Sequence, residues 1–254
     1  MKPYAPFLPP LAGLVNMPIV IAHRGASAYE PENTLRAVRH ALNLGAPAIE
    51  VDVRRVKDRE LVIMHDETVS RTTDGTGRVA DLSLEELRQL DAGLGERVPT
   101  LREIASAVCD RALLVIEIKE RGLWRDALDV VSKSGDPQRT LFVSFLADEI
   151  KDLMTSRPEM RAGILFHGFS ESAIGKAAEA GASVAGFRHD GLTEHLVDTA
   201  HRSNLEVLAW TIDDPGRARQ VAALGVDYIA SNAPDLILAA LSGSEDSSFP
   251  PSAQ

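Results

Sequence analysis

The sequence predicts an α/β fold, a single (β/α)8 TIM barrel with a short insertion after the second strand region. Short apolar runs alternate with helical patterns along the 254 residues, and glycines end several helical patterns just before the next apolar run. Roughly eight such strand–helix units fit a closed barrel, which commonly takes ~250 residues as one domain. A doubly wound open sheet is the alternative, but no glycine-rich dinucleotide-binding motif follows the first strand.

The expected strands are apolar at most positions, as are parallel strands that helices cover. In chain order they are PIVIA (18–22), AIEVDV (48–53), LVIM (61–64), LLVIEI (113–118), TLFVSF (140–145), AGILF (162–166), SVAGF (183–187), EVLAW (206–210) and VDYIA (226–230). Acidic side chains interrupt the second and fourth of these runs. Because catalytic groups of such barrels come from the carboxyl ends of strands, these interruptions are the first candidates for function.

The helices between these strands begin at recognisable capping residues. Ser83–Glu86 and Thr100–Glu103 have the pattern of a capping box, in which a hydroxyl and a carboxylate accept hydrogen bonds from free backbone amides. Asp214 before Pro215 predicts an N-cap followed by proline at the first helical position. The sequence therefore marks three helix starts directly.

Single residues indicate the other helix boundaries. Gly45, Gly181 and Gly225 each end a helical pattern, where glycine readily adopts the left-handed C-cap conformation. Asn33 is expected to cap the first helix, and Glu32 is expected to begin it or to support a functional group.

Residues 17–241 are expected to form the barrel, between an extended N-terminal lead at 1–16 and a disordered C-terminal tail at 242–254. The tail is polar and rich in proline and serine. Prolines interrupt the N-terminal apolar stretch, which makes it a poor signal peptide, and no run of ~18 apolar residues could span a membrane. We therefore expect a cytoplasmic protein without stable membrane insertion. Its single cysteine, Cys109, cannot form an internal disulfide.

The overall charge argues against a nucleic-acid partner. The formal net charge is −10, whereas nucleic-acid binding relies on Lys and Arg to neutralise phosphates. The chain also has only 2 Trp, 3 Tyr and 7 Phe residues, which weakens any base-stacking model. The sequence leaves a homo-oligomer possible, because helix-rich barrel exteriors often dimerise, but no stretch of it indicates an interface.

Four ionisable side chains alternate with apolar ones in two of the strands. Glu50 and Asp52 point to one strand face, and Glu117 and Lys119 repeat the arrangement in a later strand. If the apolar residues pack beneath the helices, all four face the barrel mouth. Three carboxylates crowded there would repel one another and raise their pKa values unless a cation joined them. Oxygen-only ligands suit Mg²⁺ or Ca²⁺ better than Zn²⁺, and we prefer a metal site to a structural ion pair.

Two histidines close apolar strands beside these carboxylates. Each of His23 and His65, taken alone, is more often a structural hydrogen-bonding residue, but the pair indicates an acid/base couple. Arg24 followed by Gly25 would suit an anion, because glycine lets the backbone approach closely; a surface ion pair is the alternative. No function is expected for the other histidines, which are His40, His167, His189, His195 and His201.

Several segments together resemble the motifs of the glycerophosphodiester phosphodiesterase family. They are AHRGASAYEPENTLRAV, IEVDVRRVKDRELVIMHDETVSRTTDGTGRV, VPTLREI, VIEIK and LAWTIDD with GVDYIASN. The match runs in order from His23 to about Asn232, and the succession of HRG, PENT, E-x-D and HD is specific. The resemblance implies a metal-dependent phosphodiesterase on a barrel fold, with residues 66–99 as a compact inserted region.

The resemblance also implies roles for individual residues. The implied catalytic pair is His23 and His65, and the implied ligands of a divalent cation, Mg²⁺ or Ca²⁺, are Glu50, Asp52 and Glu117. Arg24 and Lys119 stand where the family has phosphate-contacting cations. Trp210 is expected to line the pocket, with a place in the core as the alternative.

Two departures from the family pattern fall at the ends of late strands. Ser231–Asn232 stands where the family often has a Thr-Asp pair, and Asp213 stands where an Asn often follows the W-T motif. We expect both departures to affect contacts at the substrate end rather than the chemistry.

The expected reaction is hydrolysis of a small-molecule glycerophosphodiester to sn-glycerol 3-phosphate and an alcohol. A diester is an anion with a poor alkoxide leaving group, so hydrolysis needs charge neutralisation, an activated nucleophile and a proton for the leaving oxygen. We expect His23 to deprotonate the nucleophile, either water or the glycerol 2-hydroxyl, and His65 to protonate the alcohol. The alternatives are a phospholipase-like enzyme acting on lysophospholipid or phosphoinositide, and a metabolite-binding barrel without turnover.

Overall fold

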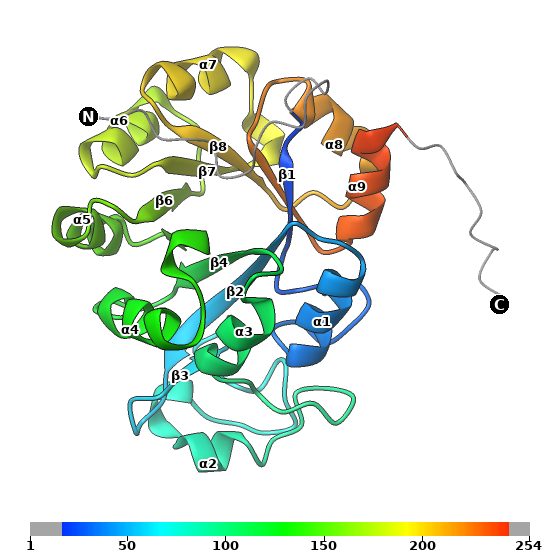
Figure 1. Cartoon of the computed structure of the whole chain (residues 1–254), viewed down its shortest axis with the longest axis vertical. Coiled ribbons are helices and arrows are strands. Elements are labelled where there is room, and N and C mark those ends of the chain that lie inside the picture. The colour runs from blue at the N-terminus through cyan, green and yellow to red at the C-terminus, as the bar shows by residue number, and fades with distance from the viewer. Residues whose placement is uncertain (1–16, 244–254) are drawn as a thin grey trace, which may run out of the picture.

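Within residues 17–243, which the computed structural model describes, eight parallel strands form a closed barrel (Figure 1). They are β1 (Ile19–Ala22), β2 (Ala48–Arg55), β4 (Leu113–Ile118), β5 (Thr140–Ser144), β6 (Arg161–Phe166), β7 (Val184–Arg188), β8 (Glu206–Trp210) and β9 (Tyr228–Ser231). Strand β1 pairs with β2 on one side and with β9 on the other, which closes the ring. The predicted (β/α)8 barrel is therefore confirmed.

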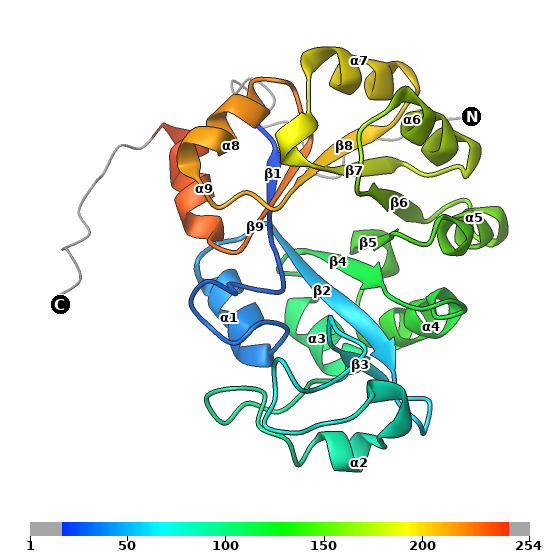
Figure 2. The ribbon, with the colours of Figure 1, turned by 180° about the vertical axis from the view of Figure 1, so that it is seen from behind.

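Helices surround the barrel on its outside, as Figures 1 and 2 show from opposite sides. They are α1 (Leu35–Asn43), α3 (Leu101–Val108), α4 (Trp124–Ser134), α5 (Ala147–Ser156), α6 (Glu171–Glu179), α7 (Glu194–Arg202), α8 (Pro215–Ala222) and α9 (Pro234–Ser242). Short 3₁₀ helices lie at Val79–Asp81, Pro137–Arg139 and His189–Gly191.

The region between β3 (Leu61–Ile63) and α3 forms a compact unit beside the barrel, at one end of the molecule in Figure 2. Strand β3 runs antiparallel to the end of β2, and the short helix α2 (Leu84–Leu87) follows it. This unit has its own apolar core, made of Val56, Val62, Met64, Val69, Val79, Leu87, Ala92 and Val98. The predicted insertion at 66–99 falls within it.

Most of the predicted helix boundaries are confirmed. Ser83 and Thr100 form capping boxes with Glu86 and Glu103, and Asp214 caps α8. The glycines that were expected to end helices all adopt a positive φ; they are Gly45, Gly181 and Gly225.

One predicted helix cap is wrong. Helix α1 is capped by Thr34, whose hydroxyl accepts a hydrogen bond from the Ala37 amide. Asn33 has a φ of 60° and instead binds β2: its Nδ2 donates to Asp52 Oδ2 at 2.8 Å, and the Asp52 amide donates to its Oδ1 at 3.2 Å. A buried carboxylate needs hydrogen-bond donors, and threonine is a good helix cap. Asn33 therefore binds Asp52, and Thr34 caps the helix.

The alternation of side chains along each strand separates two apolar layers and positions the site. In β4 the residues that pack outward with the helices are Leu114, Ile116 and Ile118. The inward residues of the same strand are Leu113 and Val115, which belong to the apolar interior of the barrel. Glu117 is the next inward residue, so the barrel interior changes from apolar to charged at the carboxyl ends of the strands.

The described residues reach close to the predicted domain boundaries. Helix α9 continues to Ser242, one residue past the expected boundary at 241. The expected lead at 1–16 and the remainder of the expected tail, 244–254, lie outside the described residues. Among residues 17–243, no helix is both long enough and apolar enough to cross a membrane.

Candidate active site

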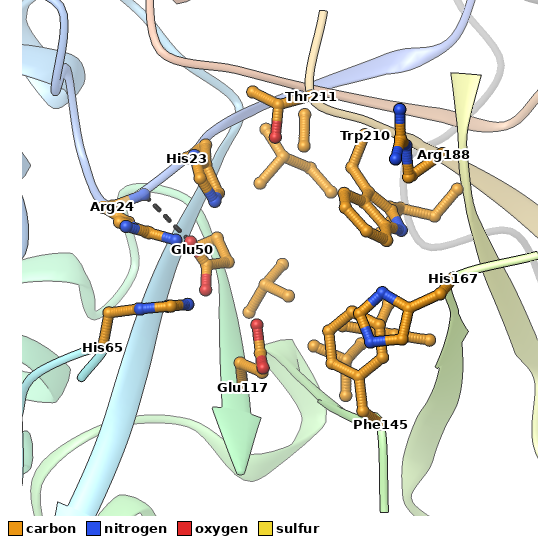
Figure 3. A pocket seen from close by; sticks show the side chains of 16 residues that line it. His23, Arg24, Glu50, His65, Glu117, Phe145, His167, Arg188, Trp210 and Thr211 are labelled. Carbon is orange, nitrogen blue, oxygen red and sulfur yellow. Dashed lines mark hydrogen bonds between the residues drawn. The ribbon is translucent and has the colours of Figure 1, made fainter. Parts of the chain in front are cut away.

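A cavity of about 370 Å³ opens at the carboxyl ends of the strands (Figure 3). One side of it is polar and is lined by His23, Arg24, Glu50, His65 and Glu117. The opposite side is largely aromatic and is lined by Phe145, His167, Arg188, Trp210 and Thr211. The structure therefore brings together, in one cavity, both of the predicted histidines and two of the predicted metal ligands. Asp52 and Lys119 lie directly behind the polar side.

Glu50, Asp52 and Glu117 form a buried acidic cluster. One carboxylate oxygen from each lies within 4.8 Å of the others, and their residues are only 6%, 0% and 8% exposed. Burial, reinforced by the charge of Asp52, raises the pKa of Glu50 to about 8 and the pKa of Glu117 to about 7. Burial also acts on Asp52, but Lys119 and Arg24 outweigh it and lower its pKa to about 2. Without a further cation, the three carboxylates are therefore not all ionised at pH 7.

Two buried oxygens of this cluster show that a divalent cation fits it. Within residues 17–243, Glu50 Oε1 and Asp52 Oδ1 accept no hydrogen bond, although Lys119 Nζ forms an ion pair with Asp52 Oδ1 at 3.2 Å. Buried acceptors normally have a partner, so these two are free to coordinate a ligand. All of the ligand atoms that the cluster offers are carboxylate oxygens, which suit a hard ion such as Mg²⁺ or Ca²⁺.

Lys119 and Arg24 hold the cluster from two sides. Lys119 Nζ donates to Glu117 Oε1 at 2.6 Å, and its side chain does not line the cavity. The Arg24 amide donates to Glu50 Oε2 at 2.9 Å, and its guanidinium lies 3.3 Å from Asp52 Oδ2. Arg24 thus reaches both the cavity and the carboxylates, whereas Lys119 mainly neutralises the carboxylates.

Gly25 lies close against the first helix. It has a φ of +79°, and a Cβ at this position would lie 2.6 Å from the backbone carbon of Ala37 in α1. The close approach that glycine permits here includes the backbone of the first helix. The expected role of Arg24 and Gly25 toward an anion stays a prediction.

His65 is backed by a carboxylate. Its Nδ1 lies 2.6 Å from Asp66 Oδ1, and Arg71 Nε donates to Asp66 Oδ2 at 2.7 Å. Arg71 also donates twice to Glu32, at 2.8 Å each, and Glu32 accepts a further hydrogen bond from Arg24. The Arg71 hydrogen bond is the main cause that lowers the pKa of Asp66. Glu32 is therefore a supporting residue, one of the two roles expected for it, and Arg71 links the insertion to the site.

His23 is backed by an amide. Its Nδ1 lies 2.8 Å from Asn232 Oδ1, and Asn232 in turn binds Asp213. Burial and the neighbouring Arg24 guanidinium lower the pKa of His23. Both departures were expected to affect the substrate end. The structure places Asn232 directly against a histidine of the cavity, with Asp213 behind Asn232. The contact spans 209 positions in sequence, so local patterns could not have revealed it.

The aromatic wall contains a residue for which the sequence predicts no function. His167 stacks on Phe145 with ring centroids 4.4 Å apart, and Trp210 meets Phe145 edge-on at 5.6 Å. Trp210 Nε1 is a buried donor that has no hydrogen-bond partner among the residues the structure describes. His167 directly follows strand β6. Its position at the end of a predicted strand is the sequence pattern that could have indicated a place in the cavity. Trp210 lines the cavity and also packs against the apolar interior of the barrel, so both of its expected placements hold in part.

The remaining histidines lie away from the cavity lining and have partners of their own. His40 pairs with Glu30, and His189 pairs with Arg217. His195 pairs with Glu171, and His201 pairs with Asp227. That these four histidines have no role in the reaction stays a prediction.

Comparison with known proteins gives a consistent assignment. Residues 23–236 match the model of the glycerophosphoryl diester phosphodiesterase family. A glycerophosphodiester phosphodiesterase of Caldanaerobacter subterraneus is 34% identical, with 87% of this chain and 96% of the relative covered. A phosphodiesterase of Oleispira antarctica, solved with the product sn-glycerol-3-phosphate, superposes with a TM-score of 0.83 at 29% identity over 89% of this chain and 97% of that one. A glycerophosphodiester phosphodiesterase of Agrobacterium tumefaciens superposes with a TM-score of 0.77 at 31% identity, over 88% and 100%.

Proposed function

The chain belongs to the glycerophosphoryl diester phosphodiesterase family, and on that premise we propose that it hydrolyses glycerophosphodiesters to sn-glycerol 3-phosphate and an alcohol with two histidines and a divalent cation. It is an enzyme of the phosphoric diester hydrolase class. The observation that supports the proposal is one cavity that two imidazoles and two carboxylates of the buried cluster line together. The product complex of the Oleispira antarctica enzyme supports sn-glycerol 3-phosphate as the product.

Glu50, Asp52 and Glu117 would hold the cation. Two of their oxygens accept no hydrogen bond from the described residues, and Asn33 and the backbone amide of Arg24 already orient the carboxylates. When bound, a divalent cation neutralises the charge of the phosphodiester and of the pentacoordinate transition state. The Arg24 guanidinium, at the cavity edge, adds a second positive charge for the phosphate oxygens.

His23 would act as the general base. Because Nδ1 faces Asn232 and the ring lines the cavity, Nε2 is the nitrogen available to the nucleophile. The lowered pKa of His23 keeps the imidazole neutral, as a base must be. Its partner is an amide, which contributes no negative charge that would favour an imidazolium.

His65 would act as the general acid. Burial lowers the pKa of His65 too, but Asp52 and Asp66 both favour its charged form and oppose that shift. A carboxylate at Nδ1 stabilises the imidazolium that donates its Nε2 proton to the departing alkoxide. The two histidines therefore differ in the group behind them, and this difference supports the assignment of base and acid.

The proposed reaction can be tested by measuring glycerol phosphate released from a panel of diesters. We expect turnover of water-soluble glycerophosphodiesters, loss of turnover after chelation, and recovery with Mg²⁺ or Ca²⁺. Faster turnover of micellar lysophospholipid than of soluble diesters would favour the phospholipase-like alternative. Absence of turnover with every diester and metal would favour a binding barrel. Early release of a cyclic phosphate would identify the glycerol 2-hydroxyl, rather than water, as the nucleophile.

Cation binding is expected to release protons and to strengthen as the pH rises. At pH 7 the raised pKa values of Glu50 and Glu117 keep the metal-free cluster partly protonated, whereas the ligands must be ionised to bind. Titration calorimetry at pH 7 in buffers of different ionisation enthalpy should show about one proton released per ion. The affinity should increase over pH 6–8 and level off above the higher pKa.

Glu50→Gln provides the control for this proton linkage, because it removes the carboxyl with the higher pKa and keeps its shape. Any residual binding should then release fewer protons. An affinity that is independent of pH, with no proton released, would contradict a site built on these two carboxyls.

A further inference from the structure

Behind His23 the structure places a hydrogen-bonded chain of two side chains. Asn232 Oδ1 accepts from His23 Nδ1 at 2.8 Å, and Asn232 Nδ2 donates to Asp213 Oδ2 at 2.7 Å. The other oxygen of Asp213 accepts from the Asn232 amide at 2.7 Å and from Ser231 Oγ at 3.0 Å. Ser27 Oγ also donates to Asn232 Oδ1 at 2.8 Å. His65 has no such intermediary, because Asp66 contacts it directly.

The carboxylate decides which way the amide of Asn232 faces. An ionised carboxylate only accepts hydrogen bonds, so the NH₂ group of Asn232 must face Asp213 and its oxygen must face His23. An amide oxygen only accepts, so the proton of the neutral imidazole must sit on Nδ1. The lone pair is then on Nε2, the nitrogen available to the cavity.

We propose that Asp213 is a positioning residue that sets the tautomer of His23 through the side-chain amide of Asn232. The proposal rests on the proposed function, in which His23 accepts a proton at Nε2. Among the described residues, Asp213 does not line the cavity, and its side chain accepts hydrogen bonds from Ser231 and Asn232 rather than from His23. Its effect on the reaction is therefore carried by the orientation of one amide.

The geometry predicts what happens when Asp213 becomes an asparagine. One oxygen must stay with the Asn232 backbone N–H, which can only donate. The new NH₂ group then faces the NH₂ group of Asn232, and two donors oppose each other at a former hydrogen-bond distance. Rotation of the Asn232 amide relieves the conflict, but it presents NH₂ to His23 Nδ1. The imidazole proton then moves to Nε2, where it blocks the base.

Exchanging the two side chains should restore the chain of hydrogen bonds. In the double variant Asp213→Asn/Asn232→Asp, a carboxylate accepts from His23 Nδ1–H and also from the new amide at 213. The single variant Asn232→Asp instead places two carboxylates 2.7 Å apart, which should disturb His23 as well. Two harmful single changes and one restored double variant are the signature of an oriented relay.

The test is steady-state kinetics on the metal-loaded enzyme, together with ¹⁵N NMR of the His23 ring. Asp213→Asn should lower kcat by about 10–100-fold with little change in KM. The double variant should recover to within about fivefold of the wild type at a pH high enough to keep His23 neutral, because the carboxylate now beside the ring favours the imidazolium. The ring nitrogen shifts, measured without substrate, should show Nδ1–H in the wild type and double variant and Nε2–H in Asp213→Asn. Melting temperatures check that each variant is folded.

Asp214→Asn is the matched control. The residue is adjacent, the charge change is the same, and Asp214 binds the Arg217 amide at the start of α8, where asparagine caps equally well. Its kcat should stay at the wild-type value. The proposal is overturned by an Asp213→Asn enzyme with wild-type kcat and an unchanged tautomer, or by a loss that the double variant does not recover. Failure of the wild-type enzyme on every diester would instead refute the proposed function, while the NMR result still decides the tautomer.

Discussion

Replacing His65 by alanine is expected to lower kcat/KM for an alkyl glycerophosphodiester by about 10²–10⁴-fold, the usual contribution of a general acid. The same variant should lose less than about tenfold on a p-nitrophenyl glycerophosphodiester, because p-nitrophenolate leaves without a proton. The physical reason lies in the cavity, where His65 faces the polar side and Asp66 stands behind its other ring nitrogen. The ratio of the two losses, measured with both substrates on one enzyme preparation, reports the acid role alone.

His195→Ala is the matched control for this experiment. His195 is a histidine with a carboxylate partner, Glu171, but it is exposed and lies outside the cavity lining. Both substrates should be turned over at wild-type rates. Equal losses on the alkyl and p-nitrophenyl esters in His65→Ala would remove the acid role and leave His65 with a binding or structural one.

Replacing Glu50 by glutamine is expected to abolish stabilisation of the protein by divalent cations. At a concentration 100 times its dissociation constant, a cation that binds only the folded state adds about 2.7 kcal/mol, or about 5–10 °C in melting temperature for a domain of this size. Glutamine keeps an acceptor for the Arg24 amide, but it removes one negative charge from the cluster. The measurement is the melting shift with Mg²⁺ or Ca²⁺ against the chelated protein, for both wild type and variant.

Glu120→Gln serves as the control for the metal experiment. Glu120 lies just beyond β4 and pairs with Arg54 at 3.1 Å, outside the acidic cluster. Its melting shift with cation should equal that of the wild type. A full shift in Glu50→Gln would count against Glu50 as a ligand, whatever the variant does to turnover.

The barrel could be predicted from the sequence because its signals are local. Apolar strand runs, capping boxes and glycine C-caps each depend on a few neighbouring residues, and the structure places strands and helices where these patterns stand. The alternation of Glu50 and Asp52 with apolar neighbours also put the acidic residues on the correct strand face. A strand period of two is enough to distinguish inside from outside.

The supporting contacts could not be predicted, because their partners are distant in sequence. Asn33 donates a hydrogen bond to Asp52 and does not cap a helix. Arg71, which lies in the insertion, donates hydrogen bonds to both Glu32 and Asp66. Asn232 lies behind His23 only because the last strand pairs with the first. A motif identifies the groups that face a ligand, but packing decides which side chain stands behind each of them.

The closure of the barrel by β1 and β9 also has a consequence for synthesis of the protein. The N-terminal strand leaves the ribosome long before its neighbour β9 has been made, since the residues that meet there are 209 positions apart. Until then β1 has an open edge and His23 has no Asn232 to hold it. A nascent chain that stops short of β9 therefore lacks the side chain that faces His23 Nδ1, however much of the barrel it has already formed.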